Sequence, residues 1–555
     1  MTGRTGGQIL VDQLKVHGAS HVFCVPGESY LAVLDALHDA SISTIVCRQE
    51  GGAAYMAEAA GKITGRPGIV MVTRGPGATN ASCGIHVASQ DSTPLIMFVG
   101  QVARDMKERE AFQELDYKAV FGTMAKWVVE IDRADRIPEI VSRAFHVATQ
   151  GRPGPVVIAL PEDMLTETAE AQDAPAFSPA VMKPGAADME ALQRRLLAAR
   201  NPIVLAGGAG WSEQGVNDLV RFAENFQLPV AVSFRRQMLF PADHPNFAGD
   251  LGIGPNPKLL QRVRQADLVL LAGGRLSEMP SQSYTLLDIP GDGSRLVHVH
   301  PGAEELNKVY RTGLGILAAP HAFAAAAAAL PRPNAVAWAG SAEAAHDDYL
   351  AWSDPSRVRT AGDLQMAGVM AHLRAAMPAD TVYCNGAGNY ATWVHRFWPF
   401  RSFASQLAPT SGTMGYGVPA AVAAKALQPG REVIAFAGDG CFLMNGQEFA
   451  TAMQYDLPII VVVVDNGMYG TIRMHQEREY PGRVSATSLR NPDFAALARS
   501  YGGHGETVAR TADFGPALER ARQSGRASII HCLIDPEAIT PGRSLTEIRN
   551  ASRAT

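Results

Sequence analysis

Two strand-like segments joined by a helix decide the fold of this chain: VIAFAGDG at residues 433–440 and IIVVVVDNG at residues 459–467. Each contains an unbroken run of apolar residues, which in the second segment are all β-branched, and such runs are typical of a strand buried on both faces of a parallel sheet. The residues between them predict a helix from about Gly446 to Tyr455. The whole is one βαβ unit, and its right-handed crossover brings both strand ends to the same edge of the sheet.

Polar residues stand directly after both strands. Asp439 follows the first strand and Asn466 follows the second. Ligands of open parallel sheets bind at this edge, and Mg²⁺ prefers carboxylate and diphosphate oxygens. Gly438 and Gly440 let the backbone approach a phosphate closely. A bare Gly-Asp-Gly would favour a tight turn with a capping Asp; the Asn at the end of the next strand reverses that preference.

The stretch GDGCFLMNGQE at 438–448, followed by Asn466, resembles the cofactor motif of thiamine-diphosphate enzymes, in the acetolactate synthase branch. The resemblance implies thiamine diphosphate and Mg²⁺ as cofactors. It also implies that the metal is held by Asp439, Asn466 and the main-chain carbonyl of Met468. The cofactor contacts that it implies in this part of the chain are Gly438, Gly440, Cys441 and Asn466.

Three further segments resemble motifs of the same family. GPGATN at 75–80 is similar to a turn that packs against the pyrimidine ring. SGTMGYG at 411–417 is similar to a segment whose bulky side chain wedges between the two cofactor rings. GAGNY at 386–390 is similar to a G-Q-H segment that grips the diphosphate. The implied contacts are Pro76, Asn80, Gly388, Asn389, Tyr390, Gly412 and Met414. The alternatives are a Gly-Pro turn that opens a helix, and a Met that fills a gap.

The family activates its cofactor with a Glu that follows a strand of the first domain. Here CRQEGGAA at 47–54 resembles that segment, so Glu50 is the predicted catalytic carboxylate. Without the other motifs, Glu50 would be an ordinary carboxylate at a helix N-terminus. In this family the Glu and the metal site come from different subunits. The resemblance therefore implies a homodimer or homotetramer with sites at the subunit interface.

Two more residues are predicted at the substrate side. AFQE at 111–114 resembles a family segment whose Gln reaches the active site, which makes Gln113 a candidate. His475 stands where acetolactate synthases usually place a Trp that selects the second 2-oxo acid. A His at that position is either a proton donor or a surface residue on a helix.

Three further residues depart from the family pattern. PGES at 26–29 places Glu28 and Ser29 where a Gly and a small residue are usual, and Arg74 precedes the Gly-Pro-Gly turn in place of a small residue. Glu28 and Ser29 either face the substrate or are solvated loop residues. Arg74 bears on the identity of the substrate.

The chain as a whole predicts an α/β fold of three doubly wound parallel-sheet domains, as its 555 residues suggest. The predicted boundaries are 1–170 for the pyrimidine-binding domain, 188–330 for the central domain and 360–535 for the diphosphate-binding domain. The first and third are expected to be two doubly wound domains of similar size. A polar C-terminal tail at 536–555 is expected to be a mobile arm.

The central domain is the least informative part. Glycine turns at 206–210 and 272–275 follow strand-like runs, and acetolactate synthases hold FAD in this domain, so FAD is left open. Residues 276–279 differ from the family pattern. Arg235 and Arg236 either bind a nucleotide phosphate or face solvent.

Composition limits the class of function. The net charge is −5 with no long basic run, so neither nucleic acid nor an anionic membrane is an expected partner. Six cysteines without C-x-x-C spacing and the lack of an apolar signal segment indicate the cytoplasm.

The predicted function is thiamine-diphosphate-dependent decarboxylation and carboligation of a small 2-oxo acid, similar to that of acetolactate synthase. The alternatives are a simple 2-oxo acid decarboxylase, or an acyl-CoA or diketone lyase on the same scaffold. A non-catalytic cofactor-binding protein is disfavoured because Glu50, Asp439 and Asn466 are all intact.

Overall fold

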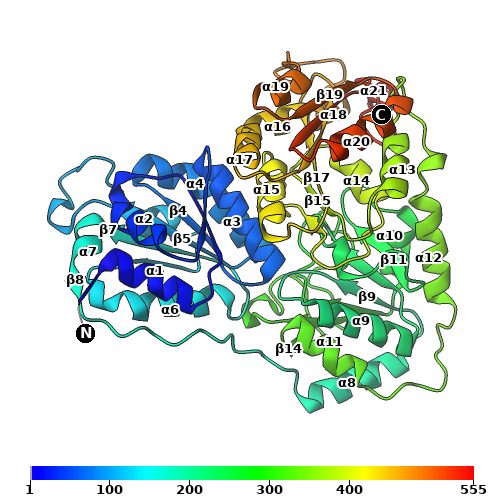
Figure 1. Cartoon of the computed structure of the whole chain (residues 1–555). Helices are drawn as coiled ribbons and strands as arrows, with labels where there is room; N and C mark the ends of the chain where they lie inside the picture. Colours follow the sequence, from blue (N-terminus) through cyan, green and yellow to red (C-terminus); the bar gives the residue numbers. More distant parts are fainter. Residues whose placement is uncertain (1–2, 555) are drawn as a thin grey trace. The chain divides into compact units, whose positions relative to one another are not determined.

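The computed structural model describes residues 3–554 (Figure 1). The chain folds into two compact units. Unit 1 comprises residues 1–180, 418–429 and 445–457, and unit 2 comprises residues 181–417, 430–444 and 458–555. Three six-stranded sheets are present, and within each of them the paired strands are parallel. This confirms the predicted α/β class with three doubly wound parallel-sheet domains.

The first sheet lies in unit 1 and has the strand order β3-β2-β4-β5-β7-β6. Its strands are β2 (His21–Cys24), β3 (Ser43–Val46), β4 (Gly68–Val72), β5 (Leu95–Gln101), β6 (Trp127–Glu130) and β7 (Pro155–Pro161). Helices α1 (Gly6–Val16), α2 (Leu31–His38) and α6 (Ile137–Thr149) pack on one face. Helices α3 (Glu50–Thr64) and α4 (Gly75–Asp91) pack side by side on the other face (Figure 1).

The third sheet lies in unit 2 and has the strand order β16-β15-β17-β18-β20-β19. Its strands are β15 (Val382–Asn385), β16 (Gln406–Leu407), β17 (Val433–Gly438), β18 (Ile460–Asp465), β19 (His504–Val508) and β20 (Ser528–Leu533). Counted along the chain, the order is second, first, third, fourth, sixth, fifth, which is the order of the first sheet as well. The expected likeness of the first and third domains therefore extends to their topology.

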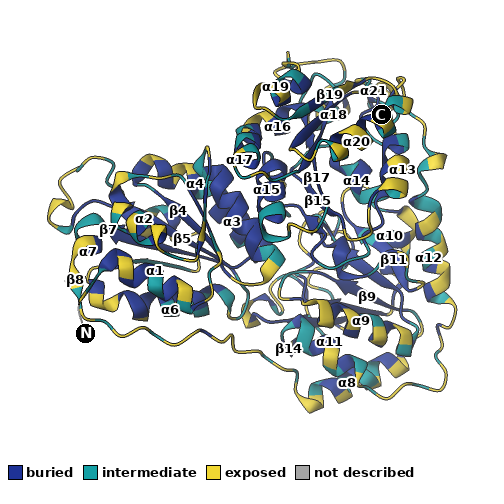
Figure 2. Cartoon of the chain, in the orientation of Figure 1, coloured by how far each residue is buried: buried dark blue, intermediate teal, exposed yellow. Residues whose placement is uncertain are grey.

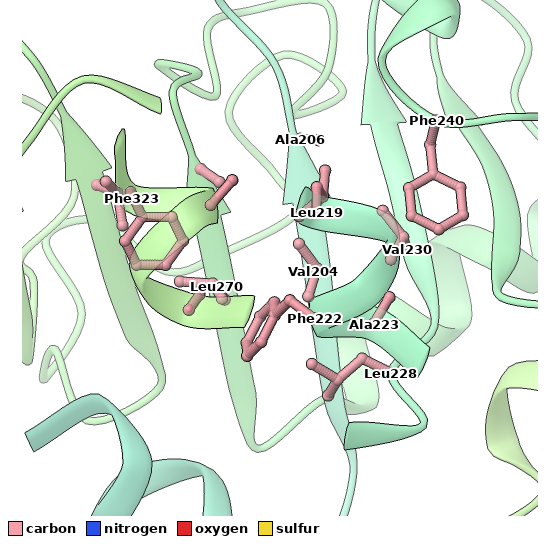
Figure 3. Close-up of a cluster of buried hydrophobic side chains, with 14 of the residues drawn as sticks. Val204, Ala206, Leu219, Phe222, Ala223, Leu228, Val230, Phe240, Leu270 and Phe323 are labelled. Atoms are coloured by element: carbon pink, nitrogen blue, oxygen red, sulfur yellow. The ribbon is translucent and has the colours of Figure 1, made fainter. Parts of the chain in front are cut away.

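The central sheet, also in unit 2, has the strand order β11-β10-β9-β12-β13-β14. Its strands are β9 (Pro202–Ala206), β10 (Val230–Ser233), β11 (Phe247–Leu251), β12 (Leu268–Ala272), β13 (Leu296–His300) and β14 (Leu314–Leu317). This is the order of dinucleotide-binding domains. Figure 3 shows Leu219 and Phe222 of α9 (Glu213–Phe226) and Phe323 of α11 (Pro320–Ala328) packing against Val204 and Leu270 of the sheet.

The pattern of buried and exposed residues follows the arrangement of each sheet between layers of helices. The strands are buried, whereas exposed residues gather on the outward sides of covering helices such as α1, α6 and α9 (Figure 2). Both faces of the sheets are covered, which explains why the central strands read as continuous apolar runs. Among residues 3–554, no helix has the length and apolar content needed to cross a bilayer.

The C-terminal segment differs from the expectation of a mobile arm. It contains α21 (Leu545–Arg553), which packs on α18 (Gly470–Glu479). Ile539, Leu545 and Ile548 form a small apolar cluster against Met474. The guanidinium of Arg549 donates two hydrogen bonds to the buried carboxylate of Glu477, of 2.8 and 2.9 Å. Apolar contacts and a bidentate ion pair thus fix a segment whose composition is polar.

Candidate active site

Asp439 and Asn466 follow adjacent parallel strands. β17 pairs with β18 so that Gly438 lies opposite Val464, and α16 (Asp439–Asn445) begins at the Asp itself. The strand order of the third sheet reverses between β15 and β17, and the carboxyl ends of the strands at such a reversal form a crevice for ligands. The predicted convergence of the two residues at one edge of the sheet is therefore present.

A cavity with an empty volume of about 810 Å³, its open mouth included, lies at this edge. The predicted residues that line it are Gly388, Asn389, Tyr390, Gly412, Met414, Gly438, Asp439, Gly440, Cys441, Asn466 and Met468. At Gly412 an added Cβ would meet no atom within 4 Å, so the space beside this residue is open. The wall is mostly apolar, and its polar part includes the side-chain oxygens of Asp439 and Asn466.

The cavity fits a group that combines apolar rings with a diphosphate and a divalent metal. Asp439 and Asn466 offer the hard oxygen donors that Mg²⁺ prefers. Gly388, Gly438 and Gly440 leave room for the rings of Tyr390 and Tyr469, which pack against their backbone in the cavity wall. Sequence reasoning did not single out six further lining residues from the start of α18 and from the chain after β20. These are Gly470, Thr471, Ile472, Ile534, Ala538 and Ile539.

Tyr390 and Asn389 have partners within the protein. The Tyr390 hydroxyl lies 3.1 Å from the sulfur of Cys441, and its ring fills the space beside Gly438, where a Cβ would come within 2.9 Å. Burial raises the pKa of Tyr390 well above its usual value. The hydroxyl of Thr471 donates to Asn389 Oδ1 over 3.0 Å. Asn389 therefore ties the start of α18 to the cavity wall, and the diphosphate contacts of both residues stay predictions.

Asp439 is held in a network of polar groups. Burial raises its pKa, and the neighbouring Asp465 acts in the same direction, while the amide of Asn491 opposes both. Asn491 Nδ2 donates to Asp439 Oδ2 over 2.7 Å and to Asp465 Oδ1 over 2.8 Å. The ring nitrogen Nε2 of His531 lies 2.9 Å from Asp465 Oδ2. A carboxylate that is costly to ionise when unpartnered is suited to a cation as its counter-charge.

The predicted half-site of the first domain lies within unit 1. Glu50 opens α3, and Asn80 of α4 donates from Nδ2 to its Oε2 over 3.0 Å. A Cβ at Gly77 would stand 3.4 Å from Glu50 Oε1, so the Gly-Pro-Gly turn packs directly on this carboxylate. Pro76 and Asn80 are exposed. The structure thus brings Glu50 and Asn80 together, and the predicted cofactor contacts of Pro76 and Asn80 stay predictions.

Glu448 holds the backbone that precedes Glu50, and sequence reasoning missed this role. Its carboxylate is fully buried and accepts the N–H groups of Arg48 and Gln49 over 3.0 and 2.9 Å. The hydroxyl of Thr451 donates to it over 2.6 Å. A Cβ at Gly52 would lie 2.6 Å from Glu448 Oε1. The N-terminus of α3 is therefore anchored by a charged acceptor, which suits the dipole of that helix.

Gln113 and Arg74 lie on the same edge of the first sheet. Gln113 has a φ of +64°, and its carbonyl accepts from the N–H of Gly75 over 3.1 Å. Its side-chain Oε1 is buried without a hydrogen-bond partner among the described residues. Arg74 is largely buried; it donates to Glu28 over 2.7 Å and to the carbonyl of Phe112 over 3.4 Å. Glu28 is therefore neither simply solvated nor unpaired, although its side chain is 59% exposed.

Replacing Arg74 by Ser should loosen the loop of residues 105–114. After allowance for the exposed Glu28, the lost charge-assisted hydrogen bonds are worth about 1–2 kcal/mol. Amides of the loop should then exchange with solvent roughly tenfold faster, which hydrogen exchange with mass spectrometry would detect. Arg109→Ser, an exposed change in the same loop, is the control. Equal exchange in Arg74→Ser and the unchanged protein would show that the ion pair does not hold the loop.

The other substrate-side residues are placed differently. Ser29 is fully buried, with its hydroxyl 3.0 Å from that of Thr73, so the solvated interpretation of this residue is wrong. His475 is exposed on α18 and does not line the cavity, whose wall takes Thr471 and Ile472 from the preceding turn of that helix. The role of His475 as a proton donor stays a prediction.

In the central domain, the glycine turns and the two arginines pack against or hydrogen-bond to other residues of this chain. The N–H of Gly207 donates to Ala272 over 3.0 Å, and a Cβ at Gly208 would come within 1.8 Å of the Gly273 carbonyl. Arg236 donates to the carbonyl of Gly208 over 3.0 Å, and Arg235 donates to that of Pro409. Both arginines are buried, so the alternative in which they face solvent is wrong.

Comparison with known proteins adds to this geometry. Residues 4–120 match the model of the thiamine pyrophosphate enzyme N-terminal TPP binding domain, residues 189–327 that of the central domain, and residues 386–532 that of the C-terminal TPP binding domain. The chain is 30% identical to the acetolactate synthase large subunit of Corynebacterium glutamicum, over 99% of this chain and 90% of the relative.

Two other relatives match over nearly their whole length. The chain is 29% identical to the acetolactate synthase isozyme 2 large subunit of Escherichia coli, over 98% of this chain and 99% of the relative. It is 29% identical to a probable acetolactate synthase large subunit of Methanocaldococcus jannaschii, over 98% and 95%. With three matching domains in the order of the three sheets, the chain belongs to the thiamine-diphosphate enzyme family, in the acetolactate synthase large-subunit branch.

Proposed function

We propose that this enzyme decarboxylates a small 2-oxo acid and joins the remaining acyl unit to an acceptor, as the name acetolactate synthase implies for its relatives. The observation that carries the proposal is the position of Asp439 and Asn466. They follow adjacent parallel strands and line a cavity at the reversal of the strand order. Pyruvate with a second 2-oxo acid is the substrate pair that the proposal names first.

The proposed cofactors are thiamine diphosphate and Mg²⁺. When bound, thiamine diphosphate supplies a carbon nucleophile for the keto group and accepts the electrons that remain when CO₂ leaves. Asp439, Asn466 and the main-chain carbonyl of Met468 are the proposed metal ligands. All three residues line the cavity, and their oxygen donors are those that Mg²⁺ prefers. FAD is left out of the proposal because Arg235 and Arg236 already donate to backbone carbonyls.

Other residues of the chain have proposed roles around the rings and the substrate. Glu50 holds a proton at the far nitrogen of the aminopyrimidine, and Asn80 keeps the Glu50 carboxyl oriented through the hydrogen bond to Oε2. Met414 separates the two rings, and the carbonyl of Gly412 accepts from the amino group. Gln113, with its unpartnered amide oxygen, contacts the substrate.

The proposed assembly is a homodimer or homotetramer in the cytoplasm. The half-site of Glu50 and Asn80 lies in unit 1, and that of Asp439 and Asn466 lies in unit 2. In the proposal, Glu50 of one copy and Asp439 of another complete one site, which follows the pattern of the family. None of the cysteines in the described residues forms a disulfide, in keeping with a reducing compartment.

The ratio of CO₂ released to pyruvate consumed tests carboligation directly. Joining two pyruvates releases one CO₂ for every two consumed, whereas simple decarboxylation releases one CO₂ for each. We expect the lower ratio from purified enzyme with thiamine diphosphate and Mg²⁺, and no release from Asp439→Ala. A ratio of one to one with accumulating acetaldehyde would instead identify a decarboxylase.

A further inference from the structure

A segment between α18 and α19 (Phe494–Ser500) lies beside the proposed metal ligands. The N–H of Leu489 donates to the carbonyl of Gly467 over 2.8 Å, and the N–H of Tyr469 donates to the carbonyl of Thr487 over 2.9 Å. Met468 and Ser488 form an antiparallel bridge between these bonds. The segment thus fixes the backbone of the turn that follows Asn466, and two residues later it presents the side chain of Asn491.

The side-chain amide of Asn491 bridges two carboxylates from adjacent strands. Its two N–H groups point to Asp439 Oδ2 and Asp465 Oδ1, over 2.7 and 2.8 Å. This orientation of the amide is required, because the flipped form would place its oxygen against both carboxylates. A neutral group with two donors is the arrangement that holds two like charges together without adding a charge.

Asp465 is the fixed side of this bridge. Its Oδ1 also accepts the N–H of Gly467 over 2.9 Å, and its Oδ2 lies 2.9 Å from His531 Nε2. The Oδ1 of Asn491 is buried with no hydrogen-bond partner within residues 3–554. Such an unsatisfied atom calls for a reason other than stability.

We propose that Asn491 is a positioning residue for the metal site. It occupies Oδ2 of Asp439 and leaves Oδ1 of that carboxylate to coordinate the metal, in the manner of the outer partners that orient metal ligands. The inference rests on the proposed function in one respect: Asp439 must be a ligand of the metal. Asn491 itself does not touch the metal, the cofactor or the substrate.

Metal affinity of the full-length, cofactor-loaded protein tests the proposal. Mn²⁺ in place of Mg²⁺, titrated in the presence of thiamine diphosphate and followed by electron paramagnetic resonance, gives that affinity without an activity assay. Asn491→Ala should weaken Mn²⁺ binding about 10- to 100-fold. Turnover at saturating metal should be largely regained, because the ligands remain. Asn491→Ser keeps one hydrogen-bond donor, so its affinity for Mn²⁺ should lie between those of Asn491→Ala and the unchanged protein. It also serves as the second variant if Asn491→Ala does not fold.

Two further variants make each outcome decisive. Arg490→Ala, an exposed neighbour, should leave the affinity unchanged. Asp439→Ala should abolish metal-dependent binding. If Asp439→Ala loses the metal but folded Asn491→Ala and Asn491→Ser bind Mn²⁺ as the unchanged protein does, the positioning role is refuted and the proposed function stands. If Asp439→Ala itself binds Mn²⁺ normally, the metal site of the proposed function fails, and the role of Asn491 fails with it.

Discussion

Glu50→Gln should lower turnover by about 10²- to 10⁴-fold, the usual contribution of a positioned acid or base. The carboxamide keeps the size of the side chain at the start of α3, but it cannot hold and return a proton at the pyrimidine nitrogen. The helix N-terminus should stay in place, since Glu448 anchors the backbone of Arg48 and Gln49. Steady-state turnover, together with the affinity for thiamine diphosphate measured by calorimetry, separates the loss of chemistry from a loss of binding.

The matched control for Glu50→Gln is Glu139→Gln, the same change at an exposed position of α6. It should leave turnover and cofactor affinity unaltered. Full turnover in Glu50→Gln with the cofactor bound would remove Glu50 from the catalytic role. A loss of cofactor binding as large as the loss of turnover would make Glu50 a binding residue only.

Asp439→Ala should weaken metal-dependent binding of thiamine diphosphate by at least about 100-fold, since a direct ligand matters at least as much as the outer partners that orient it. The change removes the charged ligand at the end of β17 and leaves the amide of Asn491 with Asp465 alone. Calorimetric titration of the cofactor with and without Mg²⁺ measures the effect.

Asp513→Ala, on the exposed surface of α20 (Thr511–Gln523), is the control for Asp439→Ala. It removes a carboxylate of the same unit and should leave cofactor binding as it was. If Asp439→Ala binds thiamine diphosphate with full affinity and the same dependence on Mg²⁺, Asp439 is not a metal ligand.

The central strands β17 and β18 could be predicted from sequence, whereas the edge strands β16 and β19 could not. β17 and β18 are buried on both faces, so their apolar runs mark them clearly. β19 is polar along much of its length, and β16 has two residues. An edge strand has a neighbour on one side only, and its partly exposed residues lack the apolar signature of a central strand.

The residues of the site could likewise be predicted only where the sequence carries a local signal. Gly-Asp-Gly and Asn466 are local signals at strand ends, and the structure brings them together as the βαβ geometry requires. Glu448 and Asn491 act through hydrogen bonds to residues far away in the sequence. The partner of Tyr390, Cys441, is likewise known only from tertiary packing. Such roles have no local pattern and depend on the folded sheet.

The C-terminal helix is a case in which a usable signal was present. Ser544 and Glu547 form a capping box, with the N–H of Glu547 donating to the Ser544 hydroxyl over 3.1 Å and the N–H of Ser544 donating to Glu547 over 2.7 Å. Leu545 and Ile548 follow at helical spacing and are buried. The polar composition of the segment outweighed these two features in the prediction of a mobile arm.

The products formed from pyruvate test the central claim most directly. Purified enzyme with thiamine diphosphate and Mg²⁺ is supplied with ¹³C-labelled pyruvate, and the products are identified by mass spectrometry. Acetolactate as the main product, containing carbon from two pyruvates, is the result predicted here. Unchanged pyruvate with the cofactor demonstrably bound, or acetaldehyde as the main product, would contradict carboligation of pyruvate.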